Sequence, residues 1–148
     1  MGELKLILEH AIKFEEYSAQ LYMSAVEKTK VESVKRILKQ LAGQELVHKQ
    51  KLETLDYTTL GAKVIADKIE AIDVKDELML TPLNEFGSLK EVFTFASKLE
   101  VDSRDMYQQL SNSVKEKKAK KLFSWLANEE EKHNTILRET IESLGLGG

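Results

Sequence analysis

The chain has 148 residues, a formal net charge of −3, a single proline and no cysteine. Without cysteine it can form no disulfide framework, Cys-based zinc site or thiol nucleophile. The negative charge argues against nucleic acid as the main partner, since phosphate binding needs a basic surface. With 42% hydrophobic and 32% charged residues, the composition predicts a soluble globular protein. A single domain over residues 1–148 is expected.

The N-terminal segment indicates where in the cell the protein is expected. Glu3 and Lys5 interrupt the apolar run of the first ten residues, so the segment lacks the core of a signal peptide. No run of about 18 apolar residues is present, which argues against a membrane-spanning helix and a membrane partner. We therefore expect a cytoplasmic protein.

Four long helices are predicted from apolar residues that recur at spacings of three and four. The first covers about residues 3–28 and the second 29–55. The third begins after Gly87, and the fourth covers 113–145, where Gly145 ends it. Three of the helix starts have the form of a capping box, in which a Ser or Thr is followed three positions later by a Glu. These pairs are Thr29 with Glu32, Ser88 with Glu91, and Ser113 with Glu116.

A long connection separates the two helical pairs. Residues 56–87 contain Pro82 and Gly87, so they cannot form one continuous helix. A short helix is a candidate for residues 63–72. A connection of this length predicts a crossover that runs along the bundle, because a tight turn would need only a few residues.

The two helical pairs repeat each other in sequence. A shift of 85 residues superimposes polar and apolar positions of the first pair on those of the second. The polar matches are Glu15/Glu100, Ser18/Ser103, Tyr22/Tyr107, Glu45/Glu130 and His48/His133. The two helical hairpins therefore look like copies of one unit.

Six ionisable residues occupy positions where the helical pattern places apolar side chains. Two helices carry Glu-x-x-His, and the other two carry a lone Glu. Four unpaired buried carboxylates would each cost several kcal/mol and would repel one another. No Lys or Arg lies beside them on these stripes, whereas two divalent cations would balance four negative charges. The predicted metal ligands are Glu15, Glu45, His48, Glu100, Glu130 and His133.

The spacing of these residues supports a dinuclear site independently. Two Glu-x-x-His helices and two single-Glu helices supply the ligands in di-iron and di-manganese carboxylate bundles. Oxygen ligands with some imidazole suit iron or manganese better than copper or a structural zinc. The alternative is that each Glu-x-x-His is a solvated pair that arose by chance. Two matches, each preceded by a Glu at the same distance, make that alternative weak.

These motifs resemble the ferritin-like superfamily, and most closely the di-iron domain of rubrerythrins and the related bacterioferritins. The segments Glu15-x-x-Ser18-x-x-x-Tyr22 and Glu100-x-x-Ser103-x-x-x-Tyr107 are similar to the family's motifs on the first and third helices. The resemblance implies an all-α fold. This would be a ferritin-like four-helix bundle built from two repeated helical hairpins with a long crossover.

The resemblance also implies how the ligands share two metal ions, which would be iron or alternatively manganese. Glu45 and Glu130 would bridge the two ions. The remaining ligands would be terminal, with Glu15 and His48 on one metal and Glu100 and His133 on the other.

Three departures from the family pattern bear on function. Ser103 stands where rubrerythrins usually carry a second Glu, so the site is more similar to the symmetric bacterioferritin type. Leu46 stands where bacterioferritins carry the haem-binding Met, so no haem is expected. The four Cys of a rubredoxin module are missing, so an external electron donor protein is expected as a partner.

Tyr22 and Tyr107 are the candidate catalytic residues besides the ligands. Each lies seven residues beyond a lone Glu, at nearly the same helical angle, so its hydroxyl could reach a metal-bound carboxylate. The alternative is that both are large core residues with a solvated tip.

Other conspicuous residues are interpreted as structural. His10 has no counterpart in the second half and is expected at the surface. Phe123 and Trp125 are expected in core or interface packing. A lysine cluster at the fourth helix is expected to be a solvated helix start, with docking of an acidic electron donor as the alternative. It consists of Lys115, Lys117, Lys118, Lys120 and Lys121.

The sequence thus predicts an enzyme, a non-haem di-iron oxidoreductase that reduces O2 or hydrogen peroxide. Two alternatives stay open. One is a ferroxidase that stores or delivers iron, and the other is a metal-binding helical bundle without turnover. Association into a homo-oligomer is compatible with the sequence, which identifies no interface.

Overall fold

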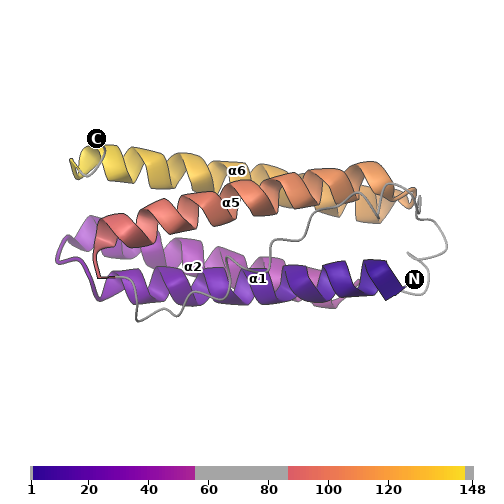
Figure 1. Cartoon of the computed structure of the whole chain (residues 1–148), viewed down its shortest axis with the longest axis horizontal. Coiled ribbons are helices and arrows are strands. Elements are labelled where there is room, and N and C mark those ends of the chain that lie inside the picture. The colour runs from indigo at the N-terminus through magenta and orange to yellow at the C-terminus, as the bar shows by residue number, and fades with distance from the viewer. Residues whose placement is uncertain (1, 56–86, 146–148) are drawn as a thin grey trace.

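The computed structural model describes residues 2–55 and 87–145. These residues form four helices that lie side by side in an elongated bundle (Figure 1). They are α1 (Gly2–Val26), α2 (Glu32–Glu53), α5 (Leu89–Ser113) and α6 (Lys117–Ser143). The predicted all-α four-helix fold is confirmed. Residues 56–86 of the expected crossover, with the short helix expected at 63–72, lie outside the described residues.

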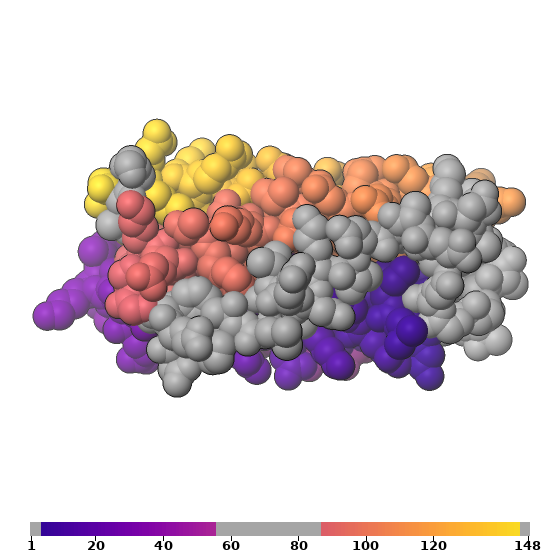
Figure 2. Space-filling view, in the orientation of Figure 1, coloured from indigo at the N-terminus to yellow at the C-terminus, as the bar shows by residue number. Residues whose placement is uncertain are grey.

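The helices pair as the repeat predicts. The most extensive contacts join α1 to α2 and α5 to α6, so each half of the repeat is a helical hairpin. The hairpins meet where α1 contacts α5 and where α2 contacts α6. In Figure 1, α1 and α5 form the layer nearer the viewer. In the space-filling view in the same orientation, the surface of α6 is visible along the upper edge of the bundle, above α5 (Figure 2).

One of the three predicted capping boxes forms. Ser88 is the N-cap of α5, and its Oγ accepts a hydrogen bond from the Glu91 backbone N–H at 3.2 Å. Glu91 accepts in return, from the backbone N–H of Gly87 at 2.9 Å. The bond to Ser88 satisfies a donor that the first turn of α5 leaves free, and the bond from Gly87 joins the residue before the cap to the same turn.

The other two capping boxes are wrong. The N-cap of α2 is Val31, which has no side-chain cap, and Thr29 instead accepts from the Val31 N–H at 3.2 Å. The N-cap of α6 is Glu116, whose carboxylate accepts from the Ala119 N–H at 2.7 Å. Ser113 ends α5, where its hydroxyl donates to the Gln109 carbonyl at 2.7 Å. Ser113 therefore belongs to α5, three residues before the N-cap of α6.

The apolar core consists of two clusters at opposite ends of the bundle. The first contains Leu8 and Phe123, and the second contains Phe93 and Leu137. Along α2, α5 and α6 the predicted ligands lie between the residues of one cluster and those of the other, and in α1 Glu15 directly follows Phe14, the first residue of the second cluster on that helix. The carboxylates and imidazoles therefore form a polar layer between two apolar regions. None of the described helices is long and apolar enough to cross a membrane.

The structure contradicts the interpretation of His10 and removes one of the two alternatives for Trp125. His10 is not at the surface: it is 7% exposed and packs edge-on against Phe14, with ring centroids 5.5 Å apart. It lies four residues before Phe14 on the buried stripe of α1, a position that the missing repeat partner did not reveal. Phe123 is fully buried in the core, whereas Trp125 is 39% exposed and lies outside it, so for Trp125 only the prediction of interface packing remains.

Candidate metal centre

All six predicted ligands are buried in the middle of the bundle, and none is more than 2% exposed. α1 and α5 each supply one Glu, and α2 and α6 each supply Glu-x-x-His. The spacing of three within Glu-x-x-His places both side chains on the inward face of one helix turn. The structure therefore brings together every residue that the sequence singled out as a ligand.

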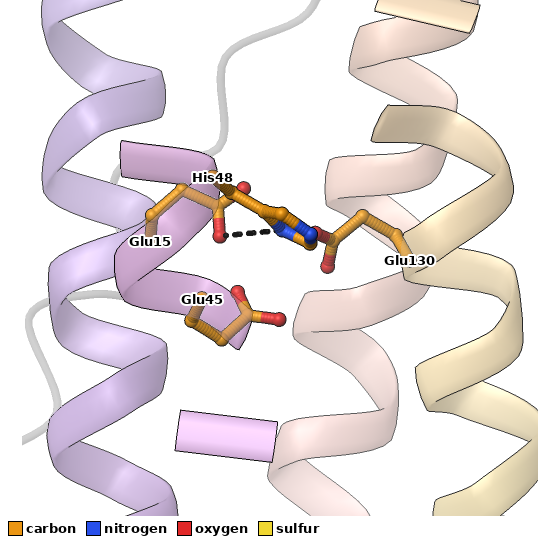
Figure 3. A group of neighbouring side chains, drawn as sticks. All are labelled: Glu15, Glu45, His48 and Glu130. Atoms are coloured by element: carbon orange, nitrogen blue, oxygen red, sulfur yellow. Dashed lines mark hydrogen bonds and ion pairs between the residues drawn. The ribbon is translucent and has the colours of Figure 1, made fainter. Parts of the chain in front are cut away.

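The six residues form two overlapping groups that share Glu45 and Glu130. In each group every residue offers one ligand atom, and these atoms lie within 4.8 Å of one another. Figure 3 shows the first group, in which side chains from α1, α2 and α6 point toward a common centre. The first group is Glu15, Glu45, His48 and Glu130, and the second is Glu45, Glu100, Glu130 and His133. Two adjacent metal positions with two shared carboxylates fit this arrangement.

Both histidines turn the same nitrogen toward the carboxylates. His48 Nδ1 lies 2.9 Å from Glu130 Oε1 and 3.4 Å from Glu15 Oε2. His133 Nδ1 lies 2.6 Å from Glu45 Oε1 and 3.7 Å from Glu100 Oε2. Nδ1 is thus the metal-facing atom of each imidazole, and Nε2 faces away from the centre.

Among the inward atoms, His48 Nδ1 and Glu130 Oε1 form a hydrogen bond, but several others have none. His133 Nδ1 and Glu45 Oε1 are close, yet neither has a hydrogen-bond partner among the described residues. The same holds for one oxygen of Glu15 and one of Glu100. Buried polar atoms are normally hydrogen-bonded, so this convergence needs a further partner. A cation accepts oxygen and nitrogen ligands from several sides, and this donor set fits iron or manganese. The residues present therefore fit a dinuclear metal centre.

Burial and mutual repulsion act most strongly on the two shared carboxyls. Desolvation raises the pKa of Glu45 and of Glu130 well above the usual value, and the charges of Glu100 and Glu15 raise both further. Desolvation alone would also raise the pKa of Glu15. Hydrogen bonds with Glu45, His48 and Tyr107 outweigh it and lower the Glu15 pKa. The protein's own groups thus favour protons on the shared carboxyls, which a bound cation would displace.

The two tyrosines cross between the hairpins. Tyr107 of α5 donates a hydrogen bond to Glu15 of α1 at 2.6 Å, and Tyr22 of α1 donates to Glu100 of α5. Both rings are fully buried, so the alternative of a solvated hydroxyl is wrong. Desolvation and the nearby carboxylates raise the pKa of each phenol well above its usual value. Both phenols therefore stay protonated as donors to carboxylates of the cluster.

Two residues that contact the cluster were missed in the sequence. Gln44 Oε1 lies 2.8 Å from His133 Nε2, and Glu129 Oε1 lies 3.8 Å from His48 Nε2. The same shift of 85 residues that aligns the ligands aligns Gln44 with Glu129. The available signal was therefore their place directly before each Glu-x-x-His.

Trp125 also contacts the cluster. Its ring meets the edge of the His48 ring at a centroid distance of 5.3 Å, and the Lys51 Nζ lies 5.3 Å from the Trp125 ring centroid. The lysine cluster at the start of α6 is exposed, as expected for a solvated helix start. Docking of an electron donor there stays a prediction.

Comparisons with known proteins agree with the fold. A family model described as a ferritin-like domain matches residues 5–143. Among solved structures, a hypothetical protein from Pyrococcus furiosus is similar, with a TM-score of 0.69 and 24% sequence identity. The match covers 92% of this chain and 86% of that chain. A search of curated proteins finds no match.

Proposed function

We propose a function from the premise that this chain belongs to the family of ferritin-like domains. The chain is an oxidoreductase that reduces O2 or hydrogen peroxide at a dinuclear iron or manganese centre. The observation that carries this proposal is the pair of overlapping Glu and His groups, buried together with inward atoms that lack partners.

The reaction requires electrons and protons that the chain alone does not hold. Reduction of one hydrogen peroxide molecule to two water molecules consumes two electrons and two protons. Two bound iron ions would supply electrons to the oxidant, and an external electron donor protein would restore them.

The chain's own residues would hold the centre and restrict access to it. Glu45 and Glu130 are placed to bind both ions, and the tyrosine hydroxyls fix the orientation of Glu15 and Glu100 through hydrogen bonds. Outer partners of this kind hold a ligand in the geometry that the metal needs. Because apolar clusters close the site at both ends, a small oxidant fits the centre better than a large substrate.

Anaerobic loading with ferrous iron tests the proposed function. The apoprotein should bind two ferrous ions per chain, and O2 or hydrogen peroxide should oxidise both within one encounter. Addition of a reductant should then allow repeated turnover without accumulation of iron. If neither oxidant reacted with the loaded protein, the oxidoreductase proposal would be wrong. Accumulation of ferric iron well beyond two ions per chain would replace it with iron storage.

Variants connect the activity to the cluster. Glu45→Ala or Glu130→Ala should abolish binding of at least one ion, because each removes a ligand that both groups share. Glu16→Ala is the matched control: Glu16 is next to Glu15 on α1, but it is exposed and pairs with Lys49 at 3.3 Å. It should retain both ions. Two ions per chain in either shared-ligand variant would contradict the assignment.

A further inference from the structure

Trp125 connects the buried cluster to the surface of the bundle. Its ring meets the edge of the His48 ring, with the centroids 5.3 Å apart, and the residue is 39% exposed. Gln44 and Glu129, which face the outer nitrogens of the two histidines, are only partly exposed. From the solvent, Trp125 and then His48 therefore lead to the Glu and His groups through two side chains in contact.

The surface around Trp125 is formed by α2 and α6. On α6, Lys121 and Lys118 precede Trp125 by four and seven residues, so they lie on the same face of the helix. On α2, the Lys51 Nζ lies 5.3 Å from the centroid of the Trp125 ring, and Val47, one turn before Lys51, is 46% exposed. We call these five residues the Trp125 face.

The Trp125 face is positively charged. Its three lysines are exposed, and none of them forms an ion pair with another described residue. Lys118 lies in the first turn of α6, where the helix dipole disfavours a positive side chain, so helix stability does not explain it. Glu129, one turn after Trp125, is paired with Lys132 at 3.3 Å. The face is therefore complementary in charge to an acidic partner.

An acidic partner fits this face better than a second copy of the chain does. A twofold dimer through the Trp125 face would bring the same residues of both copies together, so the lysines of one copy would approach those of the other. Like charges that meet across an interface oppose association, whereas opposite charges accelerate the encounter of two proteins. The charge of the face thus favours a different protein with an acidic surface.

We propose that the Trp125 face docks the external electron donor, an acidic one-electron redox protein, and that Trp125 shortens the path of the electrons to His48. The inference rests on the proposed oxidoreductase and names the chemistry of its partner and the point of electron entry. Two reduced donor molecules each give up one electron, and two ferric ions in the cluster each accept one and become ferrous. Trp125 undergoes no net oxidation, because its ring only bridges the gap between the donor and the ligand.

Calorimetry tests the docking without any turnover. The probe is an oxidised plant-type ferredoxin, an acidic protein that carries an iron–sulfur cluster. It should bind the wild-type chain, and the double variant Lys118→Glu with Lys121→Glu should bind it about tenfold more weakly, because two attractive charges become repulsive. Lys90→Glu with Lys98→Glu is the matched control, since both lysines are exposed on α5 and the net charge changes equally. The control should bind ferredoxin nearly as tightly as the wild type does.

Anaerobic stopped-flow measurements separate docking from electron delivery. Reduced ferredoxin should reduce the ferric-loaded wild type at a rate that falls as salt is added. At saturating ferredoxin, Trp125→Leu should slow this reduction severalfold while its affinity for ferredoxin stays near that of the wild type, and Trp125→Phe should retain more of the rate. Reduced methyl viologen is a small cation that needs no basic docking face. It should reduce the wild type and both double lysine variants at equal rates.

The outcomes separate this inference from the proposed function. Equal ferredoxin affinity in the two double lysine variants, or no binding to the wild type, would overturn the docking face alone. An unchanged rate at saturating ferredoxin in Trp125→Leu would overturn the role of Trp125. A wild-type dimer that dissociates in Val47→Asp, measured by sedimentation, would assign the face to a second copy and overturn the inference. A loaded wild type that reduced methyl viologen cannot reduce would overturn the proposed oxidoreductase and the inference with it.

Discussion

Each tyrosine beside the cluster donates a hydrogen bond to a carboxylate of the other hairpin. Tyr22 extends from α1 to Glu100 of α5, and Tyr107 extends from α5 to Glu15 of α1. The two bonds link the hairpins across the polar layer. They also give two buried carboxylates a donor that no backbone group in a helix interior can supply.

Removing one of these hydroxyls should destabilise the fold. Tyr22→Phe or Tyr107→Phe leaves a buried carboxylate oxygen without its donor, which costs about 1–3 kcal/mol. Urea unfolding of the apoprotein measures this loss. Tyr17→Phe is the control, because Tyr17 is only partly buried and packs on Phe95. A loss no larger in Tyr107→Phe than in Tyr17→Phe would contradict the role given to the bond with Glu15.

Metal binding should release protons in the pH range to which burial raises the pKa values of Glu45 and Glu130. Burial and neighbouring charges raise the pKa of Glu45 and Glu130, so these carboxyls hold protons at a pH where an ordinary Glu is ionised. A metal binds the ionised form, so affinity should fall as the pH falls through the raised pKa values. Titration in weakly buffered solution measures the released protons. Binding without proton release, and with an affinity that does not change with pH, would refute this reading of the two carboxyls.

At the residue scale, helical periodicity in the sequence was enough to predict the six ligands. Glu45 and His48 stand out because they replace apolar residues on an inward stripe, a pattern that a solvated pair does not need. Gln44 and Glu129 carry no such mark, because a polar residue next to a ligand is ordinary on any helix. Their role depends on how α2 faces α6, which only the packed structure gives.

At the scale of the elements, three helix starts carry the same Ser/Thr-x-x-Glu pattern, and only one forms the predicted box. For Ser113 the reason is where the preceding helix ends. Ser113 is still the last residue of α5, and Glu116, three residues later, is the N-cap of α6. The pattern fixes a helix start within a few residues but does not decide which side chain caps it.

Cap variants should follow the observed caps. Glu116→Ala and Ser88→Ala should each lower the free energy of unfolding by about 0.5–2 kcal/mol, because each removes an acceptor for a backbone N–H in the first turn. Thr29→Ala should cost less, since Thr29 accepts only from Val31, before α2 begins. Chemical denaturation measures all three. Thr29→Ala as costly as Glu116→Ala would contradict the assignment of the caps.

At the scale of the whole molecule, a polar layer divides the apolar core into two clusters. The four helices and their pairing into hairpins followed from apolar periodicity and the internal repeat. The partial exposure of Trp125 did not, because it depends on how Trp125 packs against His48 and Lys51 of α2. A bundle with four buried carboxylates at its centre gains stability if a cation neutralises them.

Metal loading should therefore raise the thermal stability of the chain. Binding to the folded state alone contributes about 2.7 kcal/mol per site when the free ion is at a hundred times its dissociation constant. Calorimetry with and without manganous ions measures the shift in Tm. Glu130→Ala should show a smaller shift, and Glu16→Ala should match the wild type. A shift of equal size in all three proteins would place the stabilising ion outside the cluster.

Anomalous X-ray diffraction from crystals loaded with iron or manganese tests the dinuclear centre most directly. Two peaks per chain are expected between the hairpins. One should lie beside His48 and Glu15 and the other beside His133 and Glu100, with Glu45 and Glu130 touching both. A fully loaded crystal with a single peak, or with peaks only outside this cluster, would contradict the account.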